Sequence, residues 1–485
     1  MITIGRSLRK GRTSMPPTMC RPRRIDRVRQ TMIMIARAAV AAAVLFTAPA
    51  NHLYADESDT ILARITPSFE FRHPGGLNTL AELKKIHTKI LASEEPWKSS
   101  FDKMLASPYA RRDYMARAVS VVSKGATEAN AIRDAVAAYT QALLWLFTED
   151  EWHAQKAGEI IDSWSGTLTS YEGLNWYLDP AWTAAPLAEA AEILRATYPK
   201  WTGAERLSKL FNDVFLPNLH GRMAFGNREF AVSNAMVAIG VFNEDRAAFY
   251  EGIHHWLRYI PSYFYVASDG PEAKQADYWL SSPSDEFLLH LDAGHPQVGW
   301  ASWVELAKGR KGDDKTGLTK DTVDELWKHP GAYLPGYTPE TGGRDLAHTE
   351  NAFLSAVNVA EIAWNQGIDI YSIGAPRLSV FMETMASIRL GEPISPAAYG
   401  GVLNLGNGLT PTYEIAYNHL HNTMGISLPK THQLIETVIR QMGPARIEPP
   451  FPAPFPASLR ANRIWEQAGW TANWETLTHG DLDRH

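Results

Sequence analysis

The sequence predicts an all-α protein in which helices arrive in antiparallel pairs. From residue 97 to about residue 260, apolar residues recur at helical spacing in one segment after another. The connections between these segments are short and contain Gly, Pro, Asp or Asn. No sustained alternation of Val, Ile and Thr, which is typical of β-strands, interrupts the pattern.

The predicted helices follow one another along most of the chain. The first pattern begins at Leu77 and ends before Pro96, because proline does not continue a helix. A Gly pair precedes the longest of the later segments, and Gly367, a residue type common after helix ends, follows it. The later helices are predicted at residues 97–106, 126–147, 150–165, 182–197, 202–220, 228–242, 245–260, 344–366, 376–390, 412–424 and 429–442.

The first 55 residues have the pattern of a secretory signal. Residues 1–37 carry a net charge of +9, and the apolar run 38–50 ends in an Ala-x-Ala sequence. The apolar run is short for a membrane-spanning helix. We therefore expect a basic leader and signal peptide over residues 1–55 and a periplasmic or secreted protein. The alternative is a basic tail with a membrane anchor.

The remainder divides into one helical domain at residues 56–445 and a Pro-rich tail at residues 446–485. Inside the domain, residues 268–343 are rich in Gly, Pro, Asp and Lys and interrupt the helical pattern. An irregular segment of this length in a folded domain is often a functional loop or lid. A surface insertion without a role is the alternative.

Charge and cysteine content exclude some function classes. The whole chain has a net charge of −6, and removal of the +9 leader takes it to −15. A protein this acidic is not expected to bind nucleic acid through a broad basic surface. Cys20 is the only cysteine and lies in the leader, so a mature chain has no disulfide and no thiolate metal site.

The helix predicted at residues 344–366 has one unusual polar face. Arg344, His348, Asn351 and Ser355 share this face at 100° per residue, and an apolar stripe lies opposite. A solvated face normally carries Lys and Glu. Arg binds carboxylates through a fixed fork of donors, and His accepts protons near neutral pH. We expect this face to form one wall of a substrate cleft.

Two further segments carry polar groups at helical spacing. Asn227 stands where a helix begins, so it is either a helix cap or a functional amide. Tyr413 and Tyr417 lie one turn apart, with His419 close by. Tyrosine can act as a base or an acid when neighbouring cations lower its pKa. Two buried tyrosines with surface histidines are the alternative.

Aromatic residues gather near residue 180, where Trp176, Tyr177 and Trp182 could stack on sugar rings or pack in the core. The chain has no Gly-x-Ser-x-Gly nucleophile motif, no His-Glu-x-x-His zinc motif and no Walker-type phosphate loop. We therefore expect neither a metal nor a cofactor.

Around these residues the chain resembles the alginate-lyase domain family. The central string is GGRDLAHTENAFLSAVNVAEIAWNQGIDIY, with an Arg-Asp-x-x-His-Thr run before Ala-Glu-Ile-Ala-Trp-Asn-Gln-Gly. The segments HPGGLNTLAEL, GNREFAVSNAMVAIGVFNEDRAAF and YEIAYNHLHNTMGI stand in the expected order around it. Together they cover most of residues 70–445. The resemblance implies an (α/α) toroid, an incomplete barrel of paired helices with a long cleft.

The resemblance also implies cleavage of an acidic polysaccharide, alginate or a related polyuronate such as glucuronan, by β-elimination. Such an enzyme must neutralise a carboxylate, remove the C5 proton and help the glycosidic oxygen leave. By resemblance, Asn227 and Arg344 neutralise the carboxylate, and His348 is the base or its partner. Tyr417 donates a proton to the leaving oxygen, and a second role in taking the C5 proton stays open. The residues expected to bind substrate are Trp176, Tyr177, Trp182, Arg228, Asn351, Tyr413 and His419.

The chain departs from the best-known branch of that family at two places. Gly226 to Arg228 stand where that branch has Asn-Asn-His, and Asn351 stands near the position of a tyrosine. Two other functions stay open. A glycoside hydrolase on a similar toroid would use two of the carboxylates of Asp179, Glu350 and Glu414. A non-catalytic glycan-binding protein would use only the aromatic residues. No nucleic acid and no stable membrane association after signal removal are expected.

Overall fold

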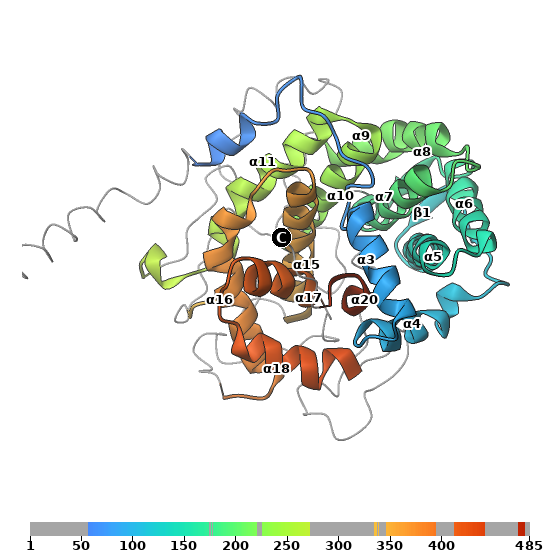
Figure 1. Cartoon of the computed structure of the whole chain (residues 1–485). Helices are drawn as coiled ribbons and strands as arrows, with labels where there is room; N and C mark the ends of the chain where they lie inside the picture. The colour runs from blue at the N-terminus through green and yellow to red at the C-terminus, as the bar shows by residue number, and fades with distance from the viewer. Residues whose placement is uncertain are drawn as a thin grey trace, which may run out of the picture. The chain divides into compact units, whose positions relative to one another are not determined.

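The fold was analysed in a computed structural model that describes residues 57–173, 176, 178–220, 226–271, 334–336, 338, 346–393, 412–441 and 474–480. The predicted leader and nearly all of the loop-rich segment after residue 271 lie outside these ranges. The described residues belong to one unit, Glu57–His485, and are mostly helical, which confirms the all-α prediction (Figure 1).

The helices follow the predicted order. Before residue 220 they are α3 (Leu80–Leu91), α4 (Trp97–Leu105), α5 (Ala126–Thr148), α6 (Glu151–Ser165), α7 (Asp179–Thr197), α8 (Ala204–Leu210) and α9 (Leu216–Leu219). After it they are α10 (Asn227–Asn243), α11 (Arg246–Tyr263), α15 (Leu346–Asn365), α16 (Tyr371–Arg389), α17 (Glu414–Tyr417), α18 (Pro429–Thr437) and α20 (Glu475–His479). Two short parallel strands, β1 (Val121–Ser123) and β2 (Ser170–Glu172), pair with Val121 opposite Ser170.

Some helix boundaries differ from the predicted ones. The first helix begins at Leu80 and not at Leu77, because Thr79 and Glu82 form a capping box at its start. The helix predicted from residue 376 begins at Tyr371, so Pro376 lies inside α16. The predicted helix 412–424 divides into α17 and a π-helical turn at Asn418–Thr423.

The same type of turn, a left-handed residue followed by an Asp cap, connects α5 to α6 and α10 to α11. Glu149 after α5 and Glu244 after α10 both adopt a left-handed conformation, with φ of 56° and 54°. The next residue in each case is an Asp whose side chain accepts hydrogen bonds from the first turn of the following helix. These turns make α5–α6 and α10–α11 tightly connected antiparallel pairs.

Glycine allows α10 and α11 to approach closely. A Cβ atom on Gly240 would lie 2.7 Å from the Phe249 backbone nitrogen, and one on Gly252 would lie 2.9 Å from the Ser233 carbonyl oxygen. Any larger side chain at these positions would push the helices apart. The pair is therefore held at a short, fixed separation.

Helices α5, α7 and α10 run in the same direction. The C-terminal ends of α5 and α7 meet where Trp145 Nε1 donates to Thr197 Oγ1 at 3.1 Å. Those of α7 and α10 meet where Arg195 donates to the Phe242 carbonyl oxygen at 2.8 Å. Since these helices also pack along their lengths, α5, α7 and α10 are parallel.

The direction of α15 follows from its neighbours. It is antiparallel to α16, because Glu350 contacts Arg389 while Glu361 contacts Tyr371. Helix α16 is parallel to α11, since Gly374 abuts Trp256 and Phe381 packs 4.9 Å from Phe264. Because α11 is antiparallel to α10, α15 is parallel to α10. Helix α10 packs between α7 and α15 (Figure 1).

The C-terminal segment 474–480 is buried against distant parts of the chain. Trp474 Nε1 donates to Thr140 Oγ1 of α5 at 2.9 Å, and the Asn78 amide donates to the Thr478 carbonyl oxygen at 3.2 Å. Asn418 donates to the carbonyl oxygen of His479 at 2.9 Å. The predicted Pro-rich tail, residues 446–485, thus contains a helix that is part of the core.

Candidate active site at the first turns of α10 and α15

The site residues of α10 and α15 lie toward one edge of the described unit. Asn227 and Arg228 are the first two residues of α10, and His348 is the third residue of α15. Because the two helices are parallel and pack together, their first turns face the same edge. Helix N-termini carry partial positive charge, which favours an acidic ligand there.

The start of α10 is set by glycine. Gly226 is the N-cap, with φ of 67° and ψ of −140°, a conformation that L side chains rarely adopt. Asn227 is therefore the first helical residue and not the cap, which removes the cap interpretation of this amide. Asn227 and Arg228 expose only 5% and 3% of their surfaces.

The polar face of α15 is buried. His348 exposes 8% of its surface, and Asn351 and Ser355 are buried as well. The next residue along this face, Asn358, has a side-chain oxygen that accepts no hydrogen bond within the described ranges, as does Asn234 of α10. Buried polar atoms of folded proteins normally have partners. These two helices therefore keep unused hydrogen-bonding capacity.

Four further predicted site residues lie either near the start of α7 or outside the described residues. Arg344 and Tyr177 lie outside the described residues. Trp182 is buried in the first turn of α7, with 6% of its surface exposed. Trp176, just before α7, is partly exposed. The parallel arrangement puts this aromatic turn toward the same edge as Asn227 and His348.

Tyr417 ends α17, directly before the π-helical turn. Its ring stacks on His421 with centroids 4.8 Å apart and lies 5.8 Å from the His432 ring of α18. Local π-helical turns are frequent at functional sites. Nothing in the sequence pattern pointed to His432, because it belongs to a different helix and comes close only through packing.

Tyr413 lies in the core on another side of α15. It donates to Glu350 Oε1 at 2.9 Å, and Arg389 binds both oxygens of the same carboxylate, at 2.9 and 2.6 Å. All three side chains are fully buried. Burial, and then the Glu350 charge, raise the pKa of Tyr413 well above its ordinary value, so the phenol stays protonated. Since Glu350 is two residues from His348, its side chain points away from the polar face.

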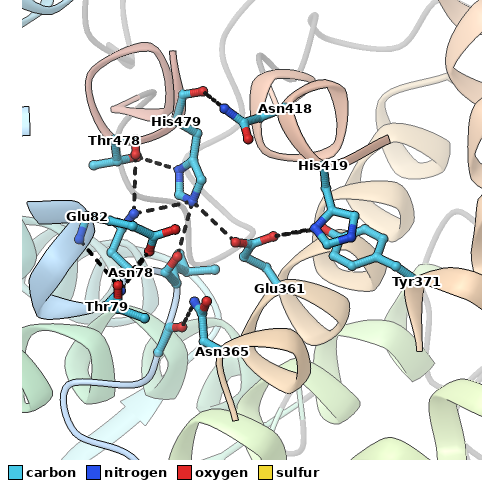
Figure 2. Close-up of polar contacts among 12 residues, drawn as sticks. Asn78, Thr79, Glu82, Glu361, Asn365, Tyr371, Asn418, His419, Thr478 and His479 are labelled. Carbon is cyan, nitrogen blue, oxygen red and sulfur yellow. Dashed lines mark hydrogen bonds and ion pairs between the residues drawn. The ribbon is translucent and has the colours of Figure 1, made fainter. Parts of the chain in front are cut away.

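His419 is also buried, against the C-terminal half of α15 (Figure 2). Its ring stacks on Tyr371 at 3.7 Å, and its Nδ1 lies 4.0 Å from Glu361 Oε2. His479 Nε2 lies 3.8 Å from the other oxygen of Glu361. One buried carboxylate is thus shared by two imidazoles. His419 is not the surface histidine that the alternative interpretation of its segment predicted.

His479 was not anticipated, and the sequence offers no signal for it. The residue lies in the last seven residues of the chain, and its partners Leu77 and Glu361 lie far away in sequence. Tyr413 and His419 contact Glu350 and Glu361, which project from a different side of α15 than His348. Asn227, Arg228 and His348 lie in the first turns of neighbouring parallel helices, and Asn351 lies one turn further along α15.

No group of three or more His, Cys, Asp or Glu side chains in the described ranges could hold a metal ion. No helix in the described part of the chain is long and apolar enough to cross a membrane. No model of a known protein family matches the sequence, and no curated protein matches it.

Proposed function

We propose that this protein is a polysaccharide lyase that cleaves alginate or a related polyuronate, such as glucuronan, by β-elimination. The observation that carries the proposal is the shared edge of two parallel helices, which bear Asn227 and His348 in their first turns. The resemblance of the segments around them to the alginate-lyase domain family supports the same reaction. The alternating parallel helices support an (α/α) toroid as the architecture.

In this proposal each group has one task. The Asn227 amide and the Arg344 guanidinium bind the uronate carboxylate and disperse the charge that develops when C5 loses its proton. His348 takes that proton, or holds the group that takes it. Tyr417 donates its proton to the glycosidic oxygen as the C4–O bond breaks and the C4–C5 double bond forms.

The placement of the carboxylates argues against the hydrolase alternative. Hydrolysis needs two carboxyl groups that reach the substrate. Glu350 is fully buried and bound by Arg389, and Glu414 is 3% exposed with an ion pair to Arg440 at 2.9 Å. Asp179 is also buried, with 1% exposure. Two of the three carboxylates are therefore held in ion pairs with arginines, and Asp179 alone does not supply the pair of carboxyl groups that hydrolysis needs.

The proposal includes export. A lyase that acts on extracellular or imported polyuronate works in the periplasm or outside the cell, as the leader pattern at residues 1–55 predicts. Edman sequencing of the secreted protein would test this. A mature chain that begins near residue 51 or 56 agrees with the proposal, and an intact leader contradicts it.

Product analysis tests the reaction class. The purified protein is incubated with alginate, glucuronan and neutral glycans while ultraviolet absorbance and reducing ends are followed. Absorbance from C4–C5 double bonds in a polyuronate is the expected result. Reducing ends without absorbance would identify a hydrolase, and retention on a glycan without cleavage would identify a binding protein.

A further inference from the structure

Three polar side chains form a stripe along one side of α11. Glu251, His255 and Tyr259 are spaced by four residues, so they stack one turn above another. Their exposed fractions are 0%, 4% and 0%. Polar groups this deeply buried are costly unless they are bound by partners. Their partners are His220, which follows α9, and Gly226 and Glu229 at the start of α10.

Two members of the stripe hold the chain on either side of Asn227. The backbone nitrogen of Gly226 donates to the hydroxyl oxygen of Tyr259 at 2.9 Å. His255 Nδ1 lies 2.7 Å from the Glu229 carboxylate, which is fully buried. The residues between these anchors, Asn227 and Arg228, are the ones proposed to contact substrate.

Glu251, the third member of the stripe, contacts the chain just after α9. Glu251 Oε2 lies 2.8 Å from His220 Nδ1, and Glu251 Oε1 lies 4.0 Å from His255 Nε2. His220 follows α9 directly, and residues 221–225 after it lie outside the described ranges. The stripe on α11 therefore holds the chain at His220 and again from Gly226 to Glu229.

We propose that Glu251, His255 and Tyr259 are positioning residues that fix the first turn of α10, and with it the Asn227 amide and the Arg228 guanidinium. The proposal rests on the proposed lyase function for its effect on turnover. None of the three needs to touch substrate. They act through the backbone of Gly226 and the carboxylate of Glu229.

The start of α10 needs such anchors. Gly226 has access to many backbone conformations, so the cap alone does not fix the helix start. The first backbone N–H groups of a helix also have no partner within the helix. Tyr259 supplies an acceptor for one of these groups just before the helix, and the His255–Glu229 ion pair ties the third residue to α11.

Charge balance favours a protonated His255. Burial lowers the pKa of His255, but the carboxylates of Glu229 from α10 and Glu251 from α11 raise it more, against a smaller opposing effect of Arg258. The net pKa is above the ordinary value. The other imidazole beside this group is that of His254, whose ring centroid lies 6.2 Å from the His255 ring centroid. Removal of the imidazolium between these two carboxylates is expected to be costly, because it leaves buried negative charge without its partner.

Two conservative variants test the proposal. Tyr259→Phe keeps the ring but removes the hydroxyl that accepts from Gly226, and His255→Gln keeps a polar side chain but removes the charge. Matched controls are Tyr114→Phe and His153→Gln, which alter a tyrosine bonded to Asp134 and a buried histidine bonded to Gln141. Neither control touches α10 in these contacts. Thermal melts establish whether each variant folds. If His255→Gln does not fold, the result for Tyr259→Phe alone decides the test.

Hydrogen exchange is measured by mass spectrometry on peptides that cover residues 226–233. Without substrate, we expect exchange there to be about tenfold faster in both α11 variants, as for the loss of one buried hydrogen bond, and unchanged in the controls. With polyuronate, we expect kcat to fall at least about tenfold while KM changes less than about twofold.

Unchanged exchange at residues 226–233 in Tyr259→Phe would overturn the proposal, as would equal acceleration in the controls. Normal kcat despite faster exchange would also overturn it. The exchange experiment does not depend on activity. If the wild-type protein releases no unsaturated product from any polyuronate, the lyase proposal fails, and the exchange result still decides whether α11 fixes the first turn of α10.

Discussion

His348, the proposed base, is almost completely buried. It lies in the first turn of α15, and 8% of its surface is exposed. Asn227 and Arg228 stand at the start of the parallel helix α10. In the lyase proposal, an amide and a guanidinium bind the carboxylate and an imidazole takes the C5 proton, while the donor to the leaving oxygen, Tyr417, comes from α17.

Substitution of the two proton-transfer residues should remove turnover. We expect His348→Ala and Tyr417→Phe each to lower kcat by about 10²- to 10⁴-fold, the usual range for general acid or base groups. The melting temperature should stay close to that of the wild type. Steady-state rates on polyuronate check this, with His153→Gln as control. Full activity in either variant would remove the role assigned to that residue.

The Arg389–Glu350 pair should be important for stability. Arg389→Met removes the guanidinium that binds both oxygens of the fully buried Glu350 carboxylate, so we expect a loss of about 3–5 kcal/mol in the free energy of unfolding. Urea denaturation measures the loss. The double variant with Glu350→Gln removes the unpaired charge and should recover part of it. Equal stability of Arg389→Met and wild type would contradict the ion-pair account.

At the residue scale, the sequence predicted which residues share a helix face, but not which distant residues they contact. The polar face of α15 was visible from periodicity, because His348, Asn351 and Ser355 recur at helical spacing. The buried sharing of Glu361 by His419 and His479 was not, since more than 50 residues separate each imidazole from that carboxylate. Spacing within one helix carries no information about such tertiary contacts.

At the scale of elements, the sequence predicted which segments are helical more accurately than it predicted where the helices begin. Helices α5, α6, α10 and α11 lie within two or three residues of the predicted bounds at each end. The start of α3 was missed because the capping box of Thr79 decides it, and the apolar pattern begins earlier. The start of α16 was predicted five residues too late, and Pro376 lies inside the helix.

The contact between α7 and the loop before α3 should depend on pH. Burial, and then the nearby charge of Glu192, raise the pKa of Glu189 to about 8, although the Leu77 N–H opposes this. The folded state therefore holds a proton that the unfolded state releases near its ordinary pKa. The stabilisation is complete at acidic pH and is lost as the pH rises toward about 8.

Glu189→Gln should reduce this dependence, because the amide resembles the protonated carboxyl group and can still accept from Leu77. Between pH 5 and 8, we expect the wild type to lose up to about 1.4 kcal/mol of unfolding free energy per pH unit more than the variant. Urea denaturation at several pH values measures both slopes, with the exposed Glu159→Gln as control. Identical slopes in wild type and Glu189→Gln would contradict a buried neutral carboxyl group.

At the scale of the whole molecule, segments far apart in sequence depend on one another. Termination before Trp474 removes the buried side chains of Trp474 and Leu477 and the partners of Asn78 and Asn418. We expect the melting temperature to fall by several degrees at least, since two large apolar side chains contribute about 3–6 kcal/mol. Termination after Gly480 should have little effect. Equal melting of both truncations would contradict the structural role of α20.

The parallel alternation of α5, α7, α10 and α15 could not be predicted from the sequence. Short turns imply antiparallel neighbours, but they do not specify which helices of different pairs pack together. Residues such as Gly240, Gly252 and Gly374 allow the close contacts that decide this, and their role is visible only when the opposing backbone or ring is known.

The mass of the product tests the central claim most directly. Glucuronan or alginate oligomers of defined length are digested with the wild-type protein and with His348→Ala, and the fragments are weighed by mass spectrometry. The lyase proposal predicts that the wild type alone yields fragments whose new non-reducing ends are lighter by one water than hydrolytic ends. Saturated ends, or unsaturated ends formed equally well by His348→Ala, would contradict it.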